Sequence, residues 1–158
     1  SLKRFHVDQW QGEYPNEQVF LADMARGECF AVTHGGEVAA VFVLSTLEQE
    51  NYAKITDGKW TADMPYCVLH RSAVSAKYRG SGMSEFMMKC VERQAAEGFG
   101  LRCIRVDTHR KNKAMQRLLR ESGYRYRGNV LIDDAGHDPA RQAYEKILKI
   151  KNIAGGCK

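Results

Sequence analysis

Two glycines between a predicted strand and a predicted helix indicate a binding site for phosphate groups. Gly80 and Gly82 stand in the hexapeptide KYRGSG, directly before a helical pattern. A turn of this kind exposes unpaired backbone N–H groups at the positive end of the helix dipole, where anions bind. Glycine also lets a ligand approach the backbone closely, because it carries no side chain. Nearby side chains add positive charge or hydroxyl donors: Lys77, Arg79, Ser81 and Ser84.

An ordinary tight turn is the alternative for a lone Gly-x-Gly pair. The two common phosphate loops do not fit this segment, because no Gly-Lys-Ser/Thr follows and no third glycine completes a dinucleotide-binding fingerprint. If the turn binds phosphate, it therefore forms a cradle of a third kind.

The elements around the turn alternate between strands and helices. The sequence predicts a strand over 66–75, and apolar residues at helical spacing predict a helix from Met83 to near Gly98. Downstream it predicts a strand over 102–108, a helix over 112–122, and two closing strands over 124–133 and 143–150.

The upstream part predicts a helix and a hairpin. Apolar residues at helical spacing favour a helix over 16–26. Two segments rich in strand formers, 29–33 and 38–44, flank the link HGGE and predict two antiparallel strands. The polar segment 49–65 is typical of a loop. The chain is therefore expected to have a mixed α/β fold.

Length and composition limit the class of protein. The 158 residues fit one domain, 1–158, and no apolar run approaches the roughly 20 residues of a membrane-spanning helix. No basic and apolar leader opens the sequence, so we expect a soluble, cytoplasmic protein without a membrane partner. Five scattered cysteines without a metal-ligand spacing are expected to be reduced, with no metal site.

The positive charge is concentrated in one part of the chain. Residues 71–128 hold 14 Lys or Arg against 5 Asp or Glu, whereas the remaining residues are net acidic. Nucleic acid, a membrane surface and a polyphosphate ligand could each bind such a basic segment, and composition alone does not choose among them.

The motifs around the turn resemble a known family. The segment 73–82, AVSAKYRGSG, resembles the acetyl-CoA motif of the GNAT superfamily of N-acetyltransferases. Further matches are the strand IRVDTH at 104–109, the helix that begins at Asn112, and Gly123-Tyr124. The resemblance is close over roughly 66–132. Outside that range, Trp10, Tyr14 and Trp60 weakly resemble a small bacterial subgroup whose substrates are not assigned.

The resemblance implies a mostly antiparallel sheet with a central, splayed pair of parallel strands and flanking helices. Relatives normally begin with a strand and a helix, so it also implies that the first strand and most of the first helix are absent from this chain. The resemblance is also compatible with a homodimer. The basic segment then serves the phosphates of acetyl-CoA, and no nucleic-acid partner is needed.

By the same resemblance, acetyl-CoA lies along the strand before the turn, and its pyrophosphate binds the turn. Asn112 contacts the cofactor arm from the following helix. The implied reaction is direct transfer of the acetyl group to a primary amine of a small molecule or peptide in a ternary complex. The residues implied to bind the cofactor are Ala73, Val74, Ser75, Lys77, Arg79, Gly80, Ser81, Gly82, Met83, Ser84, Asn112 and Met115.

The catalytic residues depart from the family pattern. Many members place an acidic tyrosine seven residues after the helix asparagine, but this chain has Leu119 there. Tyr124 or Tyr126 could supply the proton instead, or simply pack. His70 could be the base if it shares a strand face with Ser72 and Val74, and a structural histidine is the alternative. His109 has the same two interpretations, as a site residue or a turn cap.

The acceptor is not identified by the sequence. Acidic residues near the loop favour a cationic amine: Glu48, Glu50, Asp57 and Asp63. Four aromatic residues could line its pocket or pack in an ordinary way: Trp10, Tyr14, Trp60 and Tyr66. A non-catalytic sensor of acyl-CoA remains the alternative to an enzyme, since the helix tyrosine is missing.

Overall fold

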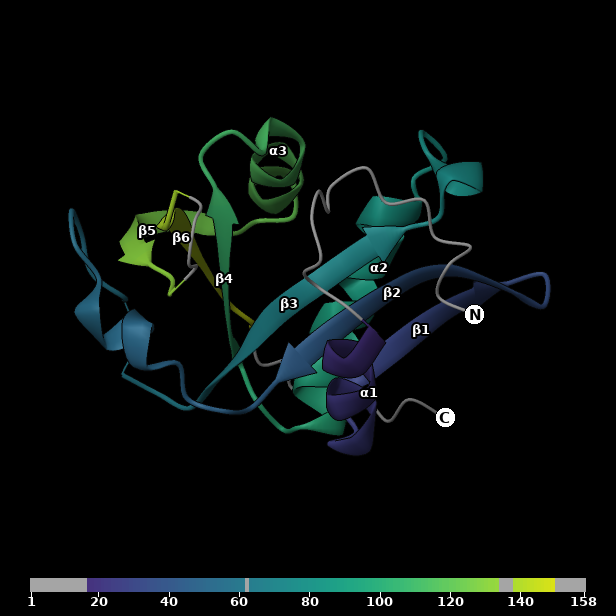
Figure 1. Cartoon of the computed structure of the whole chain (residues 1–158), viewed down its shortest axis with the longest axis horizontal. Coiled ribbons are helices and arrows are strands. Elements are labelled where there is room, and N and C mark those ends of the chain that lie inside the picture. Colours follow the sequence, from purple (N-terminus) through teal and green to yellow (C-terminus); the bar gives the residue numbers. More distant parts are fainter. Residues whose placement is uncertain (1–16, 62, 134–137, 150–158) are drawn as a thin grey trace.

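The computed structural model describes residues 17–61, 63–133 and 138–149. Trp10 and Tyr14 lie outside this part of the chain. Six strands form one mixed sheet in the order β1-β2-β3-β4-β6-β5 (Figure 1). The strands are β1 Cys29–His34, β2 Glu37–Ser45, β3 Tyr66–Val74, β4 Cys103–His109, β5 Arg125–Leu131 and β6 Ala140–Ile147.

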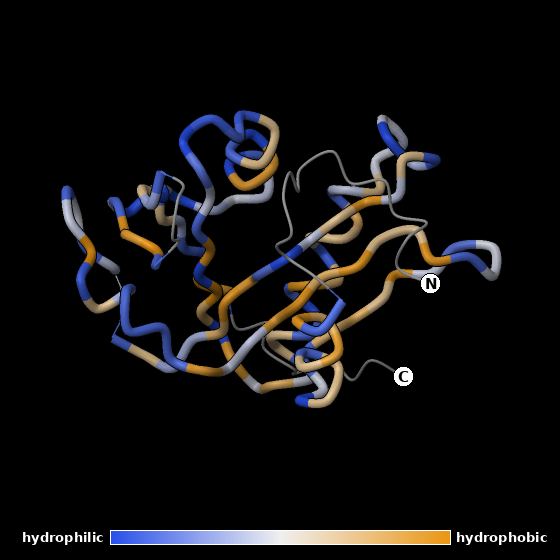
Figure 2. Tube along the Cα trace, viewed as in Figure 1, coloured by the Kyte–Doolittle hydropathy of each residue, from blue (hydrophilic) through white to orange (hydrophobic). Residues whose placement is uncertain are grey.

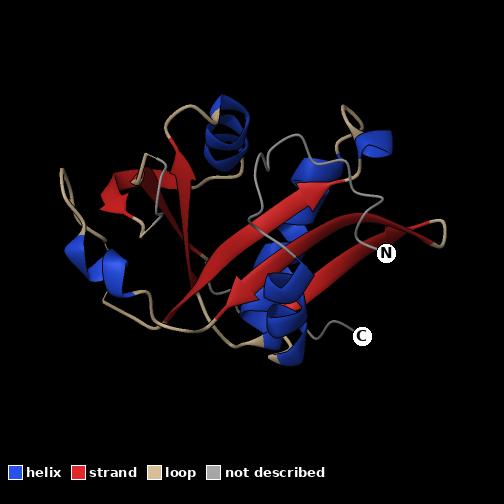
Figure 3. Cartoon of the chain, in the orientation of Figure 1, coloured by secondary structure: helices blue, strands red, loops and turns tan. Residues whose placement is uncertain are grey.

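Three α-helices flank the sheet: α1 Glu17–Ala25, α2 Met83–Arg93 and α3 Lys113–Glu121. α1 lies on the opposite side of the sheet from α2 (Figure 1). Figure 3 shows the helices on both sides of the strands. α2 continues into a π-helical turn, Gln94–Gly98, so the predicted helix from 83 to near 98 is confirmed with a wider last turn. Every predicted strand and helix is present, with ends that differ by a few residues.

β3 and β4 are the only parallel neighbours in the described sheet, and they separate along their length. Three pairs join them, from Tyr66–Cys103 to Val68–Arg105, and no pair follows. Figure 1 shows the two strands starting together and pointing apart. The predicted splayed parallel pair is therefore confirmed.

A β-bulge at Arg71 changes which residues of β3 share a face. Val41 and Val43 of β2 are two residues apart, but their partners on β3, Ala73 and His70, are three apart. Arg71 lies between them with a φ of 40°, in the left-handed region. The extra residue reverses the alternation of side chains.

The prediction that His70 shares a face with Ser72 and Val74 is therefore wrong. His70 lies on the face of Val43, whereas Val74 packs against the opposite core, which includes Met87 of α2. Simple alternation fails because it assumes no extra residue between the two positions.

The main hydrophobic core lies between the sheet and the pair α2 and α3. Figure 2 shows apolar residues along β2 and β3 and on α2. Buried residues of this core come from both helices and from five strands, and include Phe42, Leu69, Met88, Ile104 and Leu119. The core fixes α2 and α3 on the same side of the opened strands.

The segment 49–65 is mostly irregular in its described residues, as predicted, but it is packed onto the sheet. It contains a 3-10 helix, Glu50–Lys54, and pairs with β5 through an isolated bridge between Thr56 and Asn129. A Cβ on Gly58 would lie 1.9 Å from the carbonyl oxygen of Arg127, so only glycine allows this approach. Periodicity does not reveal this segment, because its contacts lie about seventy residues away in sequence.

The last strand is inserted into the sheet. β6 pairs with β4 on one side and with β5 on the other, so it lies inside the sheet although it follows both strands in the sequence. It begins at Ala140, three residues before the predicted start. None of the helices in the described ranges is long and apolar enough to cross a bilayer.

Candidate active site

A cleft of about 440 Å³ lies beside the end of β3 that no longer pairs with β4, and beside α2 and α3. One wall is the end of β3, and the other walls are the two helices. Its lining residues are Ser72, Ala73, Val74, Arg79, Ser84, Glu85, Met87, Ala114, Met115, Arg117, Leu118 and Glu121. Five of the residues predicted to bind the cofactor are among them: Ala73, Val74, Arg79, Ser84 and Met115.

The glycine turn leads from β3 into α2 at the edge of this cleft. Gly80 and Gly82 have φ values of 71° and 86°, which other residues rarely adopt. An added Cβ at either position would meet no protein atom within 4 Å, so the backbone conformation is what requires glycine. Neither amide N–H donates to an acceptor in the described part of the chain. With the first N–H groups of α2, starting at Met83, they make a group of unpaired donors of the kind that anions bind.

The rest of the turn is held by internal hydrogen bonds. The amides of Arg79 and Ser81 donate to the carbonyl oxygens of Ala76 and Tyr78. The Ser81 hydroxyl also donates to the Tyr78 carbonyl. Two amides of the turn therefore stabilise the turn itself, and those of Gly80, Gly82 and Met83 are the ones left for a ligand.

The cations near the turn have different partners. The Lys77 ammonium donates to Glu37 at the tip of the β1–β2 hairpin, 2.5 Å away. This carboxylate raises the pKa of Lys77, and Lys77 in turn lowers the pKa of Glu37. Arg79 and Arg117 line the cleft, whereas Arg110 pairs with Asp138 outside it. Ser75 is the residue directly before the turn helix Ala76–Tyr78.

Asn112 is the N-cap of α3. Its side-chain oxygen accepts a hydrogen bond of 3.0 Å from the Met115 amide, as capping residues commonly do. The cap fixes the start of α3 at the cleft, where Met115 and Arg117 form part of the wall. Asn112 thus positions the helix. Its contact with the cofactor arm stays a separate prediction.

His70 stands beside the opening of the two strands, on the face covered by α1. It lies two residues past Val68, the last residue of β3 that pairs with β4. Burial lowers the pKa of His70 to about 4, and the positive charge of Arg71 adds to this effect. The imidazole is therefore neutral at pH 7.

Asp107 is a candidate that the sequence reasoning did not select. It lies two residues past Arg105, the β4 partner of Val68, and so occupies the position on β4 equivalent to His70 on β3. The Tyr52 hydroxyl donates a hydrogen bond of 2.6 Å to its carboxylate. Burial raises the pKa of Asp107, and the hydrogen bond from Tyr52 partly offsets this. The sequence held one signal for Asp107 as a site residue, its place near the end of a predicted strand, two residues before His109.

Tyr124 is buried in the main core and does not line the cleft. Its pKa is raised well above the usual value, mainly by burial and further by the charge of Glu92. This placement favours packing over the predicted role as the acid. Leu119 is buried in the same core, and Tyr126 is exposed with its hydroxyl bonded to Asn129.

His109 caps a turn. Its Nδ1 atom accepts a hydrogen bond of 3.1 Å from the Lys111 amide, and its Nε2 atom lies 3.4 Å from Asp138. Of the two interpretations raised by the sequence, a site residue or a turn cap, these contacts favour the turn cap.

Two of the predicted pocket aromatics enclose an arginine instead. The Arg105 guanidinium lies 4.4 Å from the ring centre of Trp60 and 4.1 Å from that of Tyr66. Arg105 also pairs with the buried Glu145 carboxylate at 3.1 Å. Because the cation is stacked between rings and paired, Trp60 and Tyr66 have a packing role here. They hold the segment 49–65 against the sheet.

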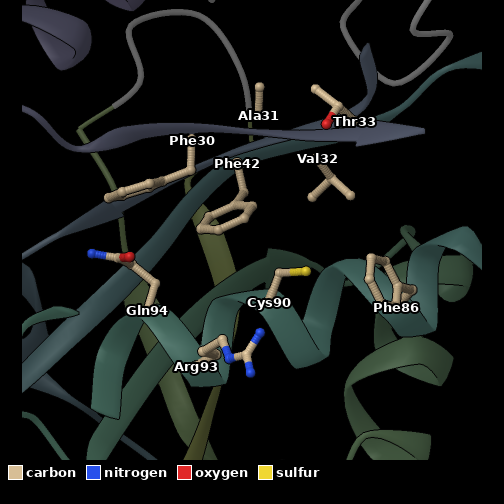
Figure 4. Close-up of a pocket in the computed structure, with 9 residues that line it drawn as sticks. All are labelled: Phe30, Ala31, Val32, Thr33, Phe42, Phe86, Cys90, Arg93 and Gln94. Atoms are coloured by element: carbon tan, nitrogen blue, oxygen red, sulfur yellow. The ribbon is translucent and has the colours of Figure 1, made fainter. Parts of the chain in front are cut away.

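A second hollow, of about 340 Å³, lies between β1 and α2. Figure 4 shows Val32 and Phe42 pointing from the strands toward α2, which carries Cys90 and Phe86. This hollow is mainly apolar and does not adjoin the glycine turn. It offers less to a phosphate ligand than the cleft does.

The described residues hold no cluster of three or more His, Cys, Asp or Glu side chains suited to a metal ion. The four cysteines in these ranges, Cys29, Cys67, Cys90 and Cys103, are free thiols. Burial raises the pKa of Cys67 to about 12 and that of Cys103 to about 11. Neither thiol is therefore activated as a nucleophile.

A sheet opened between two parallel strands, with a glycine turn and a cleft beside the unpaired end of β3, is the arrangement expected of a GNAT-like acetyltransferase fold. The sequence matches the family model of the acetyltransferase (GNAT) family over residues 1–124. The chain therefore belongs to the GNAT family of acetyltransferases. It is an N-acetyltransferase, and acetyl-CoA is its acetyl donor, as in the family generally.

Solved structures agree with this assignment. A GNAT-family acetyltransferase from Streptococcus agalactiae is 34% identical, with a TM-score of 0.78 over 90% of this chain and 79% of that chain. An acetyltransferase from Bacillus subtilis in complex with CoA is 18% identical, with a TM-score of 0.60 over 86% of each chain.

An IAA acetyltransferase from Bacillus cereus is 18% identical, with a TM-score of 0.61 over 85% of this chain and 87% of that chain. At 18% identity, the similarities to the Bacillus subtilis and Bacillus cereus structures show the fold alone. No curated protein sequence matches this chain significantly.

Proposed function

We propose that the protein transfers the acetyl group of acetyl-CoA directly to a primary amine while both substrates are bound. The observation that carries the proposal is the position of the cleft, which extends from Arg79 at the glycine turn along the end of β3 that no longer pairs with β4. The diphosphate binds at the turn and at Arg79, and the pantetheine arm follows Ala73 to Ser75. The thioester then reaches the opening between the strands.

In the proposed reaction, the neutral amine nitrogen attacks the thioester carbon. A carbon–nitrogen bond forms, the carbon–sulfur bond breaks, and CoA leaves as a thiolate that takes up a proton. The amine loses a proton to a base. Direct transfer is supported by the absence of cysteine among the described residues that line the cleft.

His70 and Asp107 are the candidate bases, because each lies two residues past the last pair that joins β3 to β4, although neither is among the residues that line the cleft. Asp107 is the stronger candidate. The pKa of His70 is lowered to about 4, which makes its imidazole a weak base, whereas burial raises the pKa of Asp107 above its ordinary value and so makes its carboxylate a better base than an exposed one. Its negative charge also suits the cationic amine that the acidic loop residues favour.

A CoA-release assay over a panel of primary amines tests the proposal. We expect at least one amine to be consumed with release of one CoA per acetylated product, detected by mass spectrometry. Product formation without a ternary complex, seen as parallel lines in double-reciprocal plots, would contradict direct transfer.

An acyl-CoA sensor without turnover is the second candidate function. It is favoured by one observation: Leu119 occupies the position of the family's acidic tyrosine, and Tyr124 does not line the cleft. The sensor would bind acetyl-CoA with ordinary affinity and release no CoA with any amine, so the same assay combined with calorimetry separates the two functions.

A further inference from the structure

Arg71 has an unusual backbone conformation at the wall of the cleft. Its φ of 40° is in the left-handed region, where a side chain crowds the backbone. Such a conformation persists only where the surrounding structure holds it. The residue forms the bulge of β3, and the next three residues, Ser72, Ala73 and Val74, line the cleft.

A buried carboxylate on α1 binds this arginine. The Nε and Nη2 atoms of Arg71 donate to the two carboxylate oxygens of Asp23 at 2.8 and 2.7 Å. The Asp23 side chain is only 1% exposed, and that of Arg71 is 15% exposed. A two-pronged ion pair of this kind fixes the orientation of both side chains, because the planar guanidinium matches the carboxylate.

The pair is also a main attachment of α1 to the sheet. Phe20 and Asp23 are the only buried residues of α1. Leu21 and Met24 are more than half exposed, so apolar packing holds this helix weakly. Arg26 binds the same carboxylate at 2.6 Å, but it does not touch the bulge within the described contacts.

The bulge decides what the cleft presents to a ligand. Without the extra residue, the alternation would place Val74 on the face of His70 rather than in the core beside α2. The backbone of Ser72 and Ala73 would then turn as well. The geometry of the cleft wall therefore depends on a bulge whose conformation is unfavourable in isolation.

We propose that Asp23 and Arg71 are a positioning pair, which holds the bulge of β3 and thereby sets the wall of the cleft against which the acyl-CoA arm lies. Neither side chain needs to touch the ligand. The effect on the bulge is independent of the ligand, whereas the effect on acyl-CoA rests on the proposed function.

The test compares Arg71→Gly and Asp23→Asn with Arg26→Gln in the whole chain. Glycine accepts the left-handed conformation but removes the ion pair. Arg26→Gln removes the other cation bound to the same Asp23 oxygen and leaves the pair with Arg71 in place. Arg71→Lys keeps the charge without the planar fork. Two measurements are made well below the melting temperature of each variant: amide hydrogen exchange over 72–74 without ligand, and affinity for CoA by calorimetry.

We expect exchange over 72–74 to rise at least about tenfold in Arg71→Gly and Asp23→Asn, and CoA affinity to fall at least about fivefold. Arg71→Lys should recover part of both effects, and Arg26→Gln should show neither. Equal results for Arg71→Gly and Arg26→Gln in both measurements would overturn the proposal and leave an ion pair that only stabilises the fold. Faster exchange in Arg71→Gly, together with no binding of CoA by the unaltered protein, would support the pair and overturn the proposed function.

Discussion

Tyr52 donates a hydrogen bond of 2.6 Å to Asp107 across 55 residues of sequence, and so connects the segment 49–65 to the opening between β3 and β4. The bond favours the ionised carboxylate and lowers the pKa of Asp107, against the effect of burial. Tyr52 itself is almost fully buried, so the contact is rigid.

If Asp107 accepts the proton of the amine, Asp107→Asn should lower kcat at least about 100-fold. Tyr52→Phe should keep the carboxylate but raise its pKa, because the stabilising hydrogen bond is lost. The acidic limb of kcat/KM should then move to higher pH. Rates of CoA release measured between pH 5 and pH 9 check both variants, and an unchanged limb in Tyr52→Phe would speak against Asp107.

Charge reversal at Arg79 should weaken acetyl-CoA binding at least about tenfold, or about 1.4 kcal/mol. Arg79 lines the cleft beside the glycine turn, where a carboxylate would repel the diphosphate. Arg120→Glu, on the exposed surface of α3 and outside the cleft lining, is the matched control. Calorimetric titration with acetyl-CoA measures both, and equal losses would indicate only a general effect of net charge.

Acid should destabilise the protein through His70. Its folded pKa of about 4 lies below the unfolded value of 6.5, because burial disfavours the charged ring. The neutral histidine thus contributes stability that is fully present above pH 6.5 and is lost as the pH falls toward 4, by up to about 3 kcal/mol.

The comparison for His70 is urea unfolding of the unaltered protein and His70→Gln at pH 7 and pH 5. The variant carries no titrating group there and should lose less stability between the two values. The same loss in both proteins would show that other groups cause the acid sensitivity.

Gly58→Ala should lower the free energy of unfolding by about 2 kcal/mol, because the new methyl group would overlap the Arg127 carbonyl. Lys59→Ala, at an exposed neighbouring position, should have little effect. Urea unfolding measures both. A loss confined to Gly58→Ala would confirm that the segment 49–65 is fixed to β5 rather than moving as a loop.

Hydrophobic periodicity predicted the elements well because most of them are strongly patterned. The stripe from Met83 to Ala95 and the strand at 66–75 needed only local information. The bulge at Arg71 could not be predicted, since a left-handed arginine has no local signal and depends on Asp23, 48 residues away. The prediction that His70 shares a face with Ser72 and Val74 was wrong for that reason.

The part of the candidate site that is formed by the backbone could be predicted from the sequence. The glycine turn and the strand before it lie where the motif placed them, and Ala73, Val74 and Arg79 line the cleft. Lys77 pairs with Glu37, and Trp60 stacks on Arg105, through contacts between distant parts of the chain. Asp107 was missed because only the register of β3 and β4 shows that it holds the same position past the last strand pair as His70.

The insertion of β6 between β4 and β5 has a consequence for synthesis of the protein. A growing chain can form the β1–β2 hairpin and add β3 and α2 as they emerge, but β4 and β5 have no neighbour between them until Ile147 has been made. Until then both strands carry unpaired edges that could aggregate. The half of the sheet that bears Asp107 must therefore fold last, and a stop codon before Ala140 would leave a phosphate-binding turn attached to an unfinished enzyme.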